Sequence, residues 1–275
     1  MNRVQASSVK MRLGCFGFVK DLDAIAAAGY DSAEMHIREI MGLDDAGFRK
    51  ALAELRSCGI PAEVFDNPIP LDSRIADQSF DLAYYRDFLN KAADRTAEMG
   101  ARYFVFGNGK ARSMPTEGDI VGASEKFNEF FDMLLDIAAQ RNITVLIEPL
   151  GKKLSNIVND LPEAVEFIEK FGRANLKTFV DYRYMVELER PLDDIERYEP
   201  YIKHVHLDNP LTVFPQRIVP RLDDGFDYGP FLDELKRIAY KEIVSIEASV
   251  FNDFPREIRE GIEFFAAYGI RPHRG

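Results

Sequence analysis

Four polar side chains stand at the ends of consecutive apolar segments in the second half of the chain. They are Glu148 in VLIEP, Asp181 in TFVDY, His206 in HVHLD and Glu247 in VSIEA. If these segments are parallel strands of a barrel, their carboxyl ends lie at one face, where such barrels carry their active sites. For one acid alone, a salt bridge or a helix cap is the simpler explanation. Three carboxylates buried together without a cation would be very unfavourable, so the four together predict a metal site.

The donor set indicates which metal this would be. Three oxygens and one nitrogen suit a single hard or borderline divalent ion, with Mn²⁺, Mg²⁺ or Co²⁺ favoured. Zn²⁺ stays an alternative, although several histidines or cysteines more often hold it. His204 lies two residues before His206 on the same strand face, and we expect it to support a ligand by a hydrogen bond. His36 ends an earlier apolar segment, where a lone histidine is weak evidence for a site.

Basic side chains follow the same apolar segments. Lys152 follows the fifth segment, Arg183 follows the sixth, and Arg217 lies in the long stretch after the seventh. Surface solvation is the simpler explanation for each of them alone. On an acidic chain, however, several cations on the expected catalytic face would suit a substrate that carries a phosphate or carboxylate group. Lys152 and Arg217 are the preferred pair, because neighbouring motifs place them near the mouth of the pocket.

Eight units of strand and helix must position these residues. The apolar segments that we expect to form strands span 11–17, 32–37, 61–66, 101–107, 143–149, 176–182, 202–208 and 242–248. Stretches with helical periodicity follow them at 21–28, 44–57, 81–99, 117–141, 160–171, 193–200, 229–239 and 255–267. Several of these helices are expected to end at a glycine, such as Gly100 and Gly172, just before the next strand.

The number of units decides the fold class. Eight strand–helix units in 275 residues match a (β/α)₈ barrel, so we predict an α/β fold with a single TIM barrel domain over 1–275. A doubly wound open sheet is the competing architecture, but it would usually have fewer strands in this length. It would also carry a glycine-rich loop after the first strand. Gly14-Cys15-Phe16-Gly17 lacks the third glycine of a dinucleotide-binding loop.

The composition argues against several classes of protein. The chain has 35 Lys and Arg against 46 Asp and Glu, a formal net charge of −11, so we expect no nucleic-acid or anionic-membrane partner. No apolar run approaches the ~20 residues of a membrane span, and the first residues lack the apolar core of a secretory signal. Two cysteines, Cys15 and Cys58, are too few for a disulfide framework, so a cytoplasmic protein is expected. The sequence leaves open whether the chain forms a homo-oligomer.

Four short motifs carry a resemblance to a known family through their order and spacing. They are IEPL at 147–150, FVDYRYM at 179–185, IKHVHLD at 202–208 and SIE at 245–247. In this arrangement the chain resembles the xylose-isomerase-like TIM-barrel superfamily of sugar phosphate isomerases and epimerases, which includes D-tagatose 3-epimerase and inosose dehydratase. The resemblance implies one divalent metal ion, bound by the strand-end residues Glu148, Asp181, His206 and Glu247.

The chain departs from this family in the sixth segment, where the usual motif is Asp-x-x-His-Met. Here the motif is Asp181-Tyr182-Arg183-Tyr184-Met185, which puts Tyr184 in place of a histidine that contacts substrate. Tyrosine can donate a hydrogen bond to a sugar oxygen but cannot shuttle protons near neutral pH. We therefore expect an intact metal site and an altered substrate contact, made by Tyr184 or by its neighbour Arg183.

These residues support a metal-dependent isomerase or epimerase of a sugar or sugar derivative, including sugar phosphates and acids. The ion would polarise a carbonyl and stabilise an enediolate, and the resemblance implies that Glu148 and Glu247 exchange the proton from two sides. A dehydratase (lyase) of a keto-cyclitol or sugar acid, acting by β-elimination from the same enediolate, is the alternative enzyme. A non-catalytic sugar-binding barrel is a third reading, supported only by Tyr184.

Overall fold

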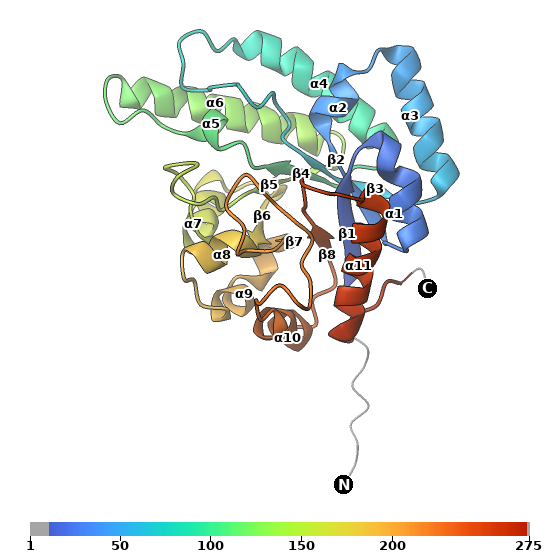
Figure 1. Ribbon diagram of the computed structural model, residues 1–275. Helices are drawn as coiled ribbons and strands as arrows, with labels where there is room; N and C mark the ends of the chain where they lie inside the picture. Colours follow the sequence, from blue (N-terminus) through green and yellow to red (C-terminus); the bar gives the residue numbers. More distant parts are fainter. Residues whose placement is uncertain (1–10, 274–275) are drawn as a thin grey trace.

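Eight parallel strands close into a barrel in a computed structural model that describes residues 11–273 (Figure 1). The strands are β1 (Arg12–Gly17), β2 (Ser32–His36), β3 (Ala62–Asp66), β4 (Tyr103–Phe106), β5 (Thr144–Ile147), β6 (Leu176–Asp181), β7 (Ile202–Leu207) and β8 (Ile243–Ile246). Each strand pairs with the next along the chain, and β8 pairs with β1. The (β/α)₈ prediction is confirmed. The ends of the predicted domain, 1–10 and 274–275, lie outside the described residues, so its bounds stay a prediction.

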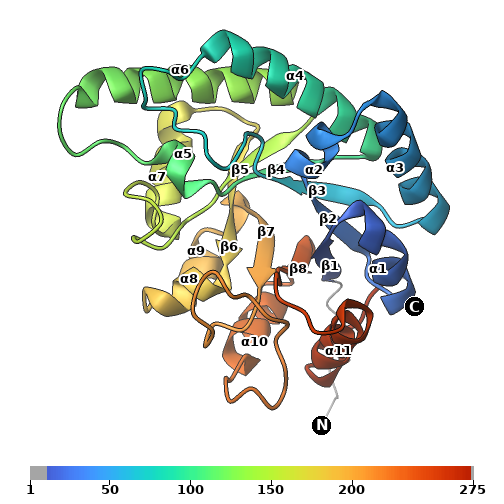
Figure 2. The ribbon, with the colours of Figure 1, turned by 45° about the horizontal axis from the view of Figure 1, so that its top comes forward.

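Helices surround the strands. The longer ones are α1 (Leu22–Ala28), α3 (Asp45–Cys58), α4 (Leu82–Met99), α6 (Ile120–Ala139), α7 (Leu161–Phe171), α10 (Gly229–Arg237) and α11 (Phe254–Ala267). The short ones are α2 (Ile37–Gly42), α5 (Gly109–Arg112), α8 (Tyr182–Glu187) and α9 (Asp193–Arg197). Two 3₁₀ turns, η1 (Val19–Asp21) and η2 (Glu199–Tyr201), complete the set in the described residues. Figures 1 and 2 show α4 and α6 side by side along one flank of the barrel. The periodicity did not predict α2, α5 and α8, which closely follow the carboxyl ends of strands.

Local sequence explains where the helices begin and end. The Asp160 carboxylate accepts a hydrogen bond from the Glu163 backbone N–H, which caps α7, and Pro162 lies in the first turn. The Asp81 carboxylate caps α4 in the same way. Gly100 ends α4 with φ of 108°, a left-handed conformation that glycine adopts without strain. These signals place the strand that follows each helix at the correct height in the barrel.

Alternation along the strands decides which side chains face inward. On β7, Val205 and Leu207 pack against the surrounding helices, whereas His204 and His206 point into the barrel. The inside is filled by a separate apolar cluster of Val64, Tyr103, Val105, Leu146, Phe179 and Ile243. Polar side chains lie above this cluster, at the carboxyl ends of the strands. Within the described residues, no helix combines the length and the apolar character needed to cross a membrane.

Candidate active site

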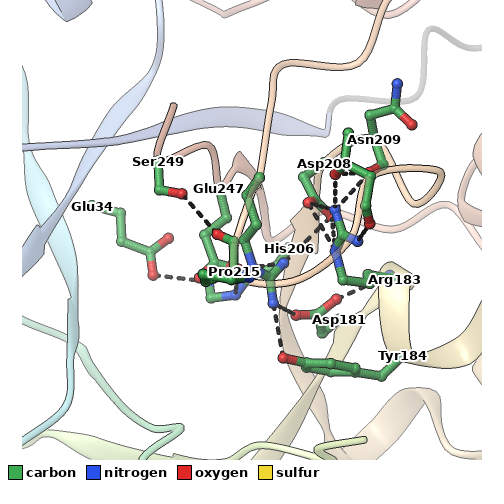
Figure 3. A network of polar contacts seen from close by, with 12 residues as sticks. Glu34, Asp181, Arg183, Tyr184, His206, Asp208, Asn209, Pro215, Glu247 and Ser249 are labelled. Carbon is green, nitrogen blue, oxygen red and sulfur yellow. Dashed lines mark hydrogen bonds and ion pairs between the residues drawn. The ribbon is translucent and has the colours of Figure 1, made fainter. Parts of the chain in front are cut away.

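Three of the four predicted metal ligands meet after β5, β6 and β7. Ligand atoms of Glu148, Asp181 and His206 all lie within 4.8 Å of one another, and all three side chains are buried. Glu247, which follows β8, reaches the same place, since its Oε2 lies 3.0 Å from Nδ1 of His206. Figure 3 shows Asp181, His206 and Glu247 converging from different strands. The barrel therefore gathers the four residues at one point of its catalytic face.

A buried arginine neutralises part of this cluster. Arg217, in the segment after β7, places one guanidinium nitrogen 2.7 Å from Asp181 Oδ2 and the other 2.9 Å from Glu247 Oε2. Its side chain is only 6% exposed. Neighbouring carboxylates raise the pKa of Arg217 well above its ordinary value, although burial alone would lower it. Arg217 is thus a fixed positive charge at the edge of the cluster, paired with two of the predicted metal ligands.

The remaining charges fit a divalent cation. Within residues 11–273, no hydrogen bond or ion pair to the Glu148 carboxylate is found, and burial, followed by the charges of Asp181 and Glu247, raises its pKa well above the ordinary value. Nδ1 of His206 and Oε2 of Glu247 form an ion pair at 3.0 Å, and Arg217 lies 2.9 Å from the same oxygen. A divalent ion would satisfy the Glu148 carboxylate, and carboxylate oxygens with one imidazole nitrogen are donors that Mn²⁺, Mg²⁺ and Co²⁺ accept.

Glu34 on β2 is a site residue that the sequence analysis missed. Its two carboxylate oxygens lie 2.9 Å from Nε2 of His204 and 2.9 Å from Nε2 of His206, and all three side chains are buried. Because an ionised carboxylate only accepts hydrogen bonds, Nε2 of His206 carries a proton and Nδ1 is directed to the cluster. His204 lies behind His206 and shares this carboxylate. An acid in the middle of the apolar strand SAEMH is the signal that could have revealed Glu34.

Tyr184 lies beside the cluster, in the position where the motif resemblance implied a histidine. Its side chain is buried, and its hydroxyl accepts a hydrogen bond of 3.2 Å from Arg217 (Figure 3). Burial, and then the charge of Asp181, raises the pKa of the Tyr184 hydroxyl above its ordinary value. Tyr184 therefore stays protonated, and its hydroxyl can donate a hydrogen bond to a bound molecule.

Two other predicted substrate contacts lie elsewhere. Arg183 is fully buried and pairs with Asp208, and it also donates to the backbone carbonyls of Asn209 and Thr212. Adjacent residues on a helix point about 100° apart, so α8 directs Tyr184 to the pocket and Arg183 into the structure below the loop. Lys152 is exposed on the loop after β5 and lines neither pocket at this face. The substrate contacts predicted for Arg183 and Lys152 thus have no geometric support.

Two adjoining cavities open on the catalytic face. The inner pocket, of about 390 Å³, is lined by Glu148, Tyr184 and His206 together with Lys110 and residues after β3 and β4. The outer pocket, of about 540 Å³, is lined mainly by residues after β1, β2 and β8. Asp66, Arg217 and Glu247 line both. Both volumes are within the range of small-molecule sites.

The fold and the site together define a TIM barrel with an acidic centre at its carboxyl-terminal face, whose side chains could hold a cation. The chain belongs to the xylose isomerase-like TIM barrel family, which it matches over residues 22–268. The resemblance noted from the motifs is thereby confirmed. The match covers the four strand ends that carry Glu148, Asp181, His206 and Glu247.

Solved structures share this barrel. The D-allulose 3-epimerase of Methylomonas sp. superposes with a TM-score of 0.78 at 16% identity, over 94% of this chain and 98% of that one. The 3-keto-D-glucoside 4-epimerase of E. coli gives 0.75 at 17%, over 94% and 99%. An AP endonuclease of family 2 from Brucella melitensis gives 0.72 at 21%, over 94% and 99%. At these identities the similarity establishes the fold.

One curated relative is also similar in sequence. The uncharacterized protein MJ1188 of Methanocaldococcus jannaschii is 25% identical over 123 residues. The match spans 45% of this chain and 44% of that protein, so it covers less than half of the relative's length.

Proposed function

We propose that the protein is a divalent-metal-dependent epimerase or isomerase of a sugar or sugar derivative. The observation that carries this proposal is the buried cluster of Glu148, Asp181 and His206, completed by Glu247 and open to the inner pocket. The same face of the barrel carries the active site in other TIM-barrel enzymes. Structurally similar proteins include an epimerase of D-allulose and an epimerase of 3-keto-D-glucosides, which supports the same class of reaction.

The site residues divide into three tasks. Glu148, Asp181, His206 and Glu247 would hold the ion, which supplies a positive charge that polarises a substrate carbonyl. Glu148 and Glu247 follow strands that are separated by β6 and β7. We propose that one removes a proton from the carbon beside the carbonyl and the other delivers a proton, to the same carbon in epimerisation or to its neighbour in isomerisation. Arg217 and the Tyr184 hydroxyl would bind sugar oxygens.

A solvent-exchange experiment tests the proposed function. The purified protein is loaded in turn with Mn²⁺, Mg²⁺, Co²⁺ and Zn²⁺, its metal content is measured, and it is incubated with a panel of ketoses in deuterium oxide. Deuterium next to the carbonyl, together with an epimer or an aldose of unchanged carbon skeleton, is the expected result. A product lighter by one water would identify a dehydratase instead. Absence of exchange from metal-loaded protein would leave only a binding role.

The proposal also includes the cellular compartment. Both cysteines are free thiols, Cys15 buried and Cys58 half-buried. Free thiols without a partner for oxidation fit the reducing cytoplasm, where sugar interconversion takes place on soluble metabolites.

A further inference from the structure

The outer pocket is a cavity of which the proposed reaction uses only the wall shared with the inner pocket. It lies against the carboxyl ends of β1, β2 and β8, and it shares Asp66, Arg217 and Glu247 with the inner pocket. Glu148 and His206 line only the inner pocket, of about 390 Å³, so we expect a sugar bound at the proposed metal to lie there. A group attached to that sugar can then extend into the adjoining outer pocket of about 540 Å³.

A histidine–carboxylate pair forms the polar part of the outer pocket. Nδ1 of His36, at the end of β2, lies 2.8 Å from Oδ1 of Asp66, at the end of β3, and the side chains are only 12% and 11% exposed. Asn67 donates to the second oxygen of Asp66 at 2.7 Å. Because the carboxylate accepts, Nδ1 carries a proton, and Nε2 is the ring nitrogen left for a ligand. Within the described part of the chain nothing bonds Nε2, so it can accept a hydrogen bond from a hydroxyl group in the pocket.

Aromatic side chains wall the same cavity. The rings of Phe16 and Phe18 lie 4.3 Å and 4.9 Å from the His36 ring, centroid to centroid. Phe251 and Phe254, after β8, pack against each other at 4.8 Å and also line the pocket. Rings next to an acceptor for hydroxyl groups suit a sugar unit, which has apolar C–H faces and polar edges.

The charges of the outer pocket favour an uncharged occupant. Three cations and three carboxylates line it, namely Lys20, Arg38, Arg217, Asp21, Asp66 and Glu247. Lys20 and Arg38 are exposed at the rim, where water screens them, whereas Asp66 and Arg217 are buried or nearly so. A phosphate in this pocket would gain contacts at the rim but would also lie near three carboxylates. A neutral, hydroxyl-bearing group meets no such repulsion.

We propose that the outer pocket binds a second, uncharged sugar unit, joined by a glycosidic bond to the sugar that reacts in the inner pocket. His36 accepts a hydrogen bond from a hydroxyl group of this unit, and Phe18 and Phe254 contact its C–H faces. The substrate is then a keto-disaccharide or a related glycoside rather than a free monosaccharide. This inference rests on the proposed function for its assignment of the reacting end, but the binding of the second unit is measured without turnover.

Three kinds of probe that share one ketose test the inference. D-Fructose, the ketose-ended disaccharides isomaltulose, maltulose and lactulose, and fructose 6-phosphate all contain fructose and differ in the group attached to it and in the position of that group. Calorimetric titration of the metal-loaded protein should give at least one disaccharide an affinity about tenfold higher than that of fructose. Equal affinities for fructose and all three disaccharides, or tightest binding of the phosphate, would overturn the inference.

Matched variants locate the contact. In His36→Asn the amide can keep the hydrogen bond to Asp66 but removes the Nε2 acceptor, so the preference for the disaccharide over fructose should fall about fivefold to tenfold. His36→Gln reaches further and should restore part of the preference. His273→Asn, on an exposed residue, is the control. Phe18→Leu is a second, independent variant that should weaken the disaccharide more than fructose, and an unchanged preference in both Phe18→Leu and His36→Asn would contradict the proposed site.

Solvent exchange separates this inference from the proposed function. If fructose exchanges deuterium but no disaccharide binds more tightly, the epimerase proposal stands and the second sugar subsite does not. If a disaccharide binds in a His36-dependent way but no sugar exchanges, the subsite stands and the catalytic proposal does not.

Discussion

The two pockets of the catalytic face differ in how the protein satisfies their polar groups. In the inner pocket, no hydrogen bond or ion pair to the Glu148 carboxylate is found within residues 11–273, whereas His206 and Glu247 pair with each other. In the outer pocket, both oxygens of Asp66 are bonded, to His36 and to Asn67. The inner pocket thus has a carboxylate that a cation from outside the chain would satisfy, whereas the Asp66 carboxylate beside the outer pocket is satisfied by the chain itself. This difference is typical of a reacting centre beside a recognition site.

The largest effect is expected from variants that remove the proposed proton-transfer groups of the inner pocket. Glu148→Gln and Glu247→Gln should each lower kcat by about 10²-fold or more, because each removes a group that transfers a proton. Metal content must be measured alongside rate, since both residues are also proposed ligands. Glu166→Gln, on the exposed side of α7, is the matched control. Near wild-type turnover in either site variant would disprove the paired-glutamate assignment.

The two histidines of β7 should differ in metal affinity. His206→Ala removes a proposed ligand and should weaken metal binding about 100-fold, whereas His204→Ala removes only a neighbour that shares Glu34 and should weaken it less than about tenfold. Titration with Mn²⁺, followed by its paramagnetic signal, measures both. Equal losses would mean that both histidines are ligands or that the metal lies deeper in the barrel.

Glu34 offers a further test of metal affinity, because it hydrogen-bonds the proposed ligand His206 without being one of the four proposed metal ligands. In Glu34→Gln, the amide offers one acceptor and one donor, so only one of the two histidines keeps its hydrogen bond. We expect metal affinity to fall about tenfold, with a smaller change in the KM for sugar. Restoration by Glu34→Asp would be partial, since the shorter side chain reaches one histidine at most. A variant that binds metal normally would show that Nδ1 of His206 is oriented by other contacts.

The sequence predicted the parts of the site that follow from strand geometry. Glu148, Asp181, His206 and Glu247 could be found because parallel strands in a barrel end at one face. Glu34 was missed because its partner histidines lie 170 and 172 residues away and no local pattern joins them. The structure pairs Arg183 with Asp208 away from the pocket, which the sequence could not show because the rotation of α8 is not visible before the helix itself is known. His36 can be assigned to a binding site only together with Asp66, which the pairing of β2 with β3 brings beside it.

The stability of the metal-free protein should depend on pH through Glu148. Its raised pKa means that the folded state holds a proton that the unfolded chain releases. The contribution of Glu148 to the free energy of unfolding is therefore fully present below pH 4.5, the ordinary pKa of the group. It is lost as the pH rises towards the raised pKa of the folded state. From pH 5 to 8, Tm should fall by about 2–3 °C more in the wild type than in Glu148→Gln. Added Mn²⁺ should remove this difference for the wild type, and parallel curves without metal would contradict the raised pKa.

The smallest expected effect concerns Tyr184, where this chain leaves its family. Tyr184→Phe removes one hydroxyl and keeps the ring, so packing is little disturbed, and the lost hydrogen bond should lower kcat/KM by ~1 kcal/mol, about fivefold. Metal content should not change, because Tyr184 contacts Arg217 rather than a ligand directly. Tyr201→Phe, which also loses a hydroxyl hydrogen bond but far from the pocket, is the control. If Tyr184→Phe is silent with every sugar, the hydroxyl serves only to hold Arg217, and Arg217→Lys should then carry the whole loss in substrate binding.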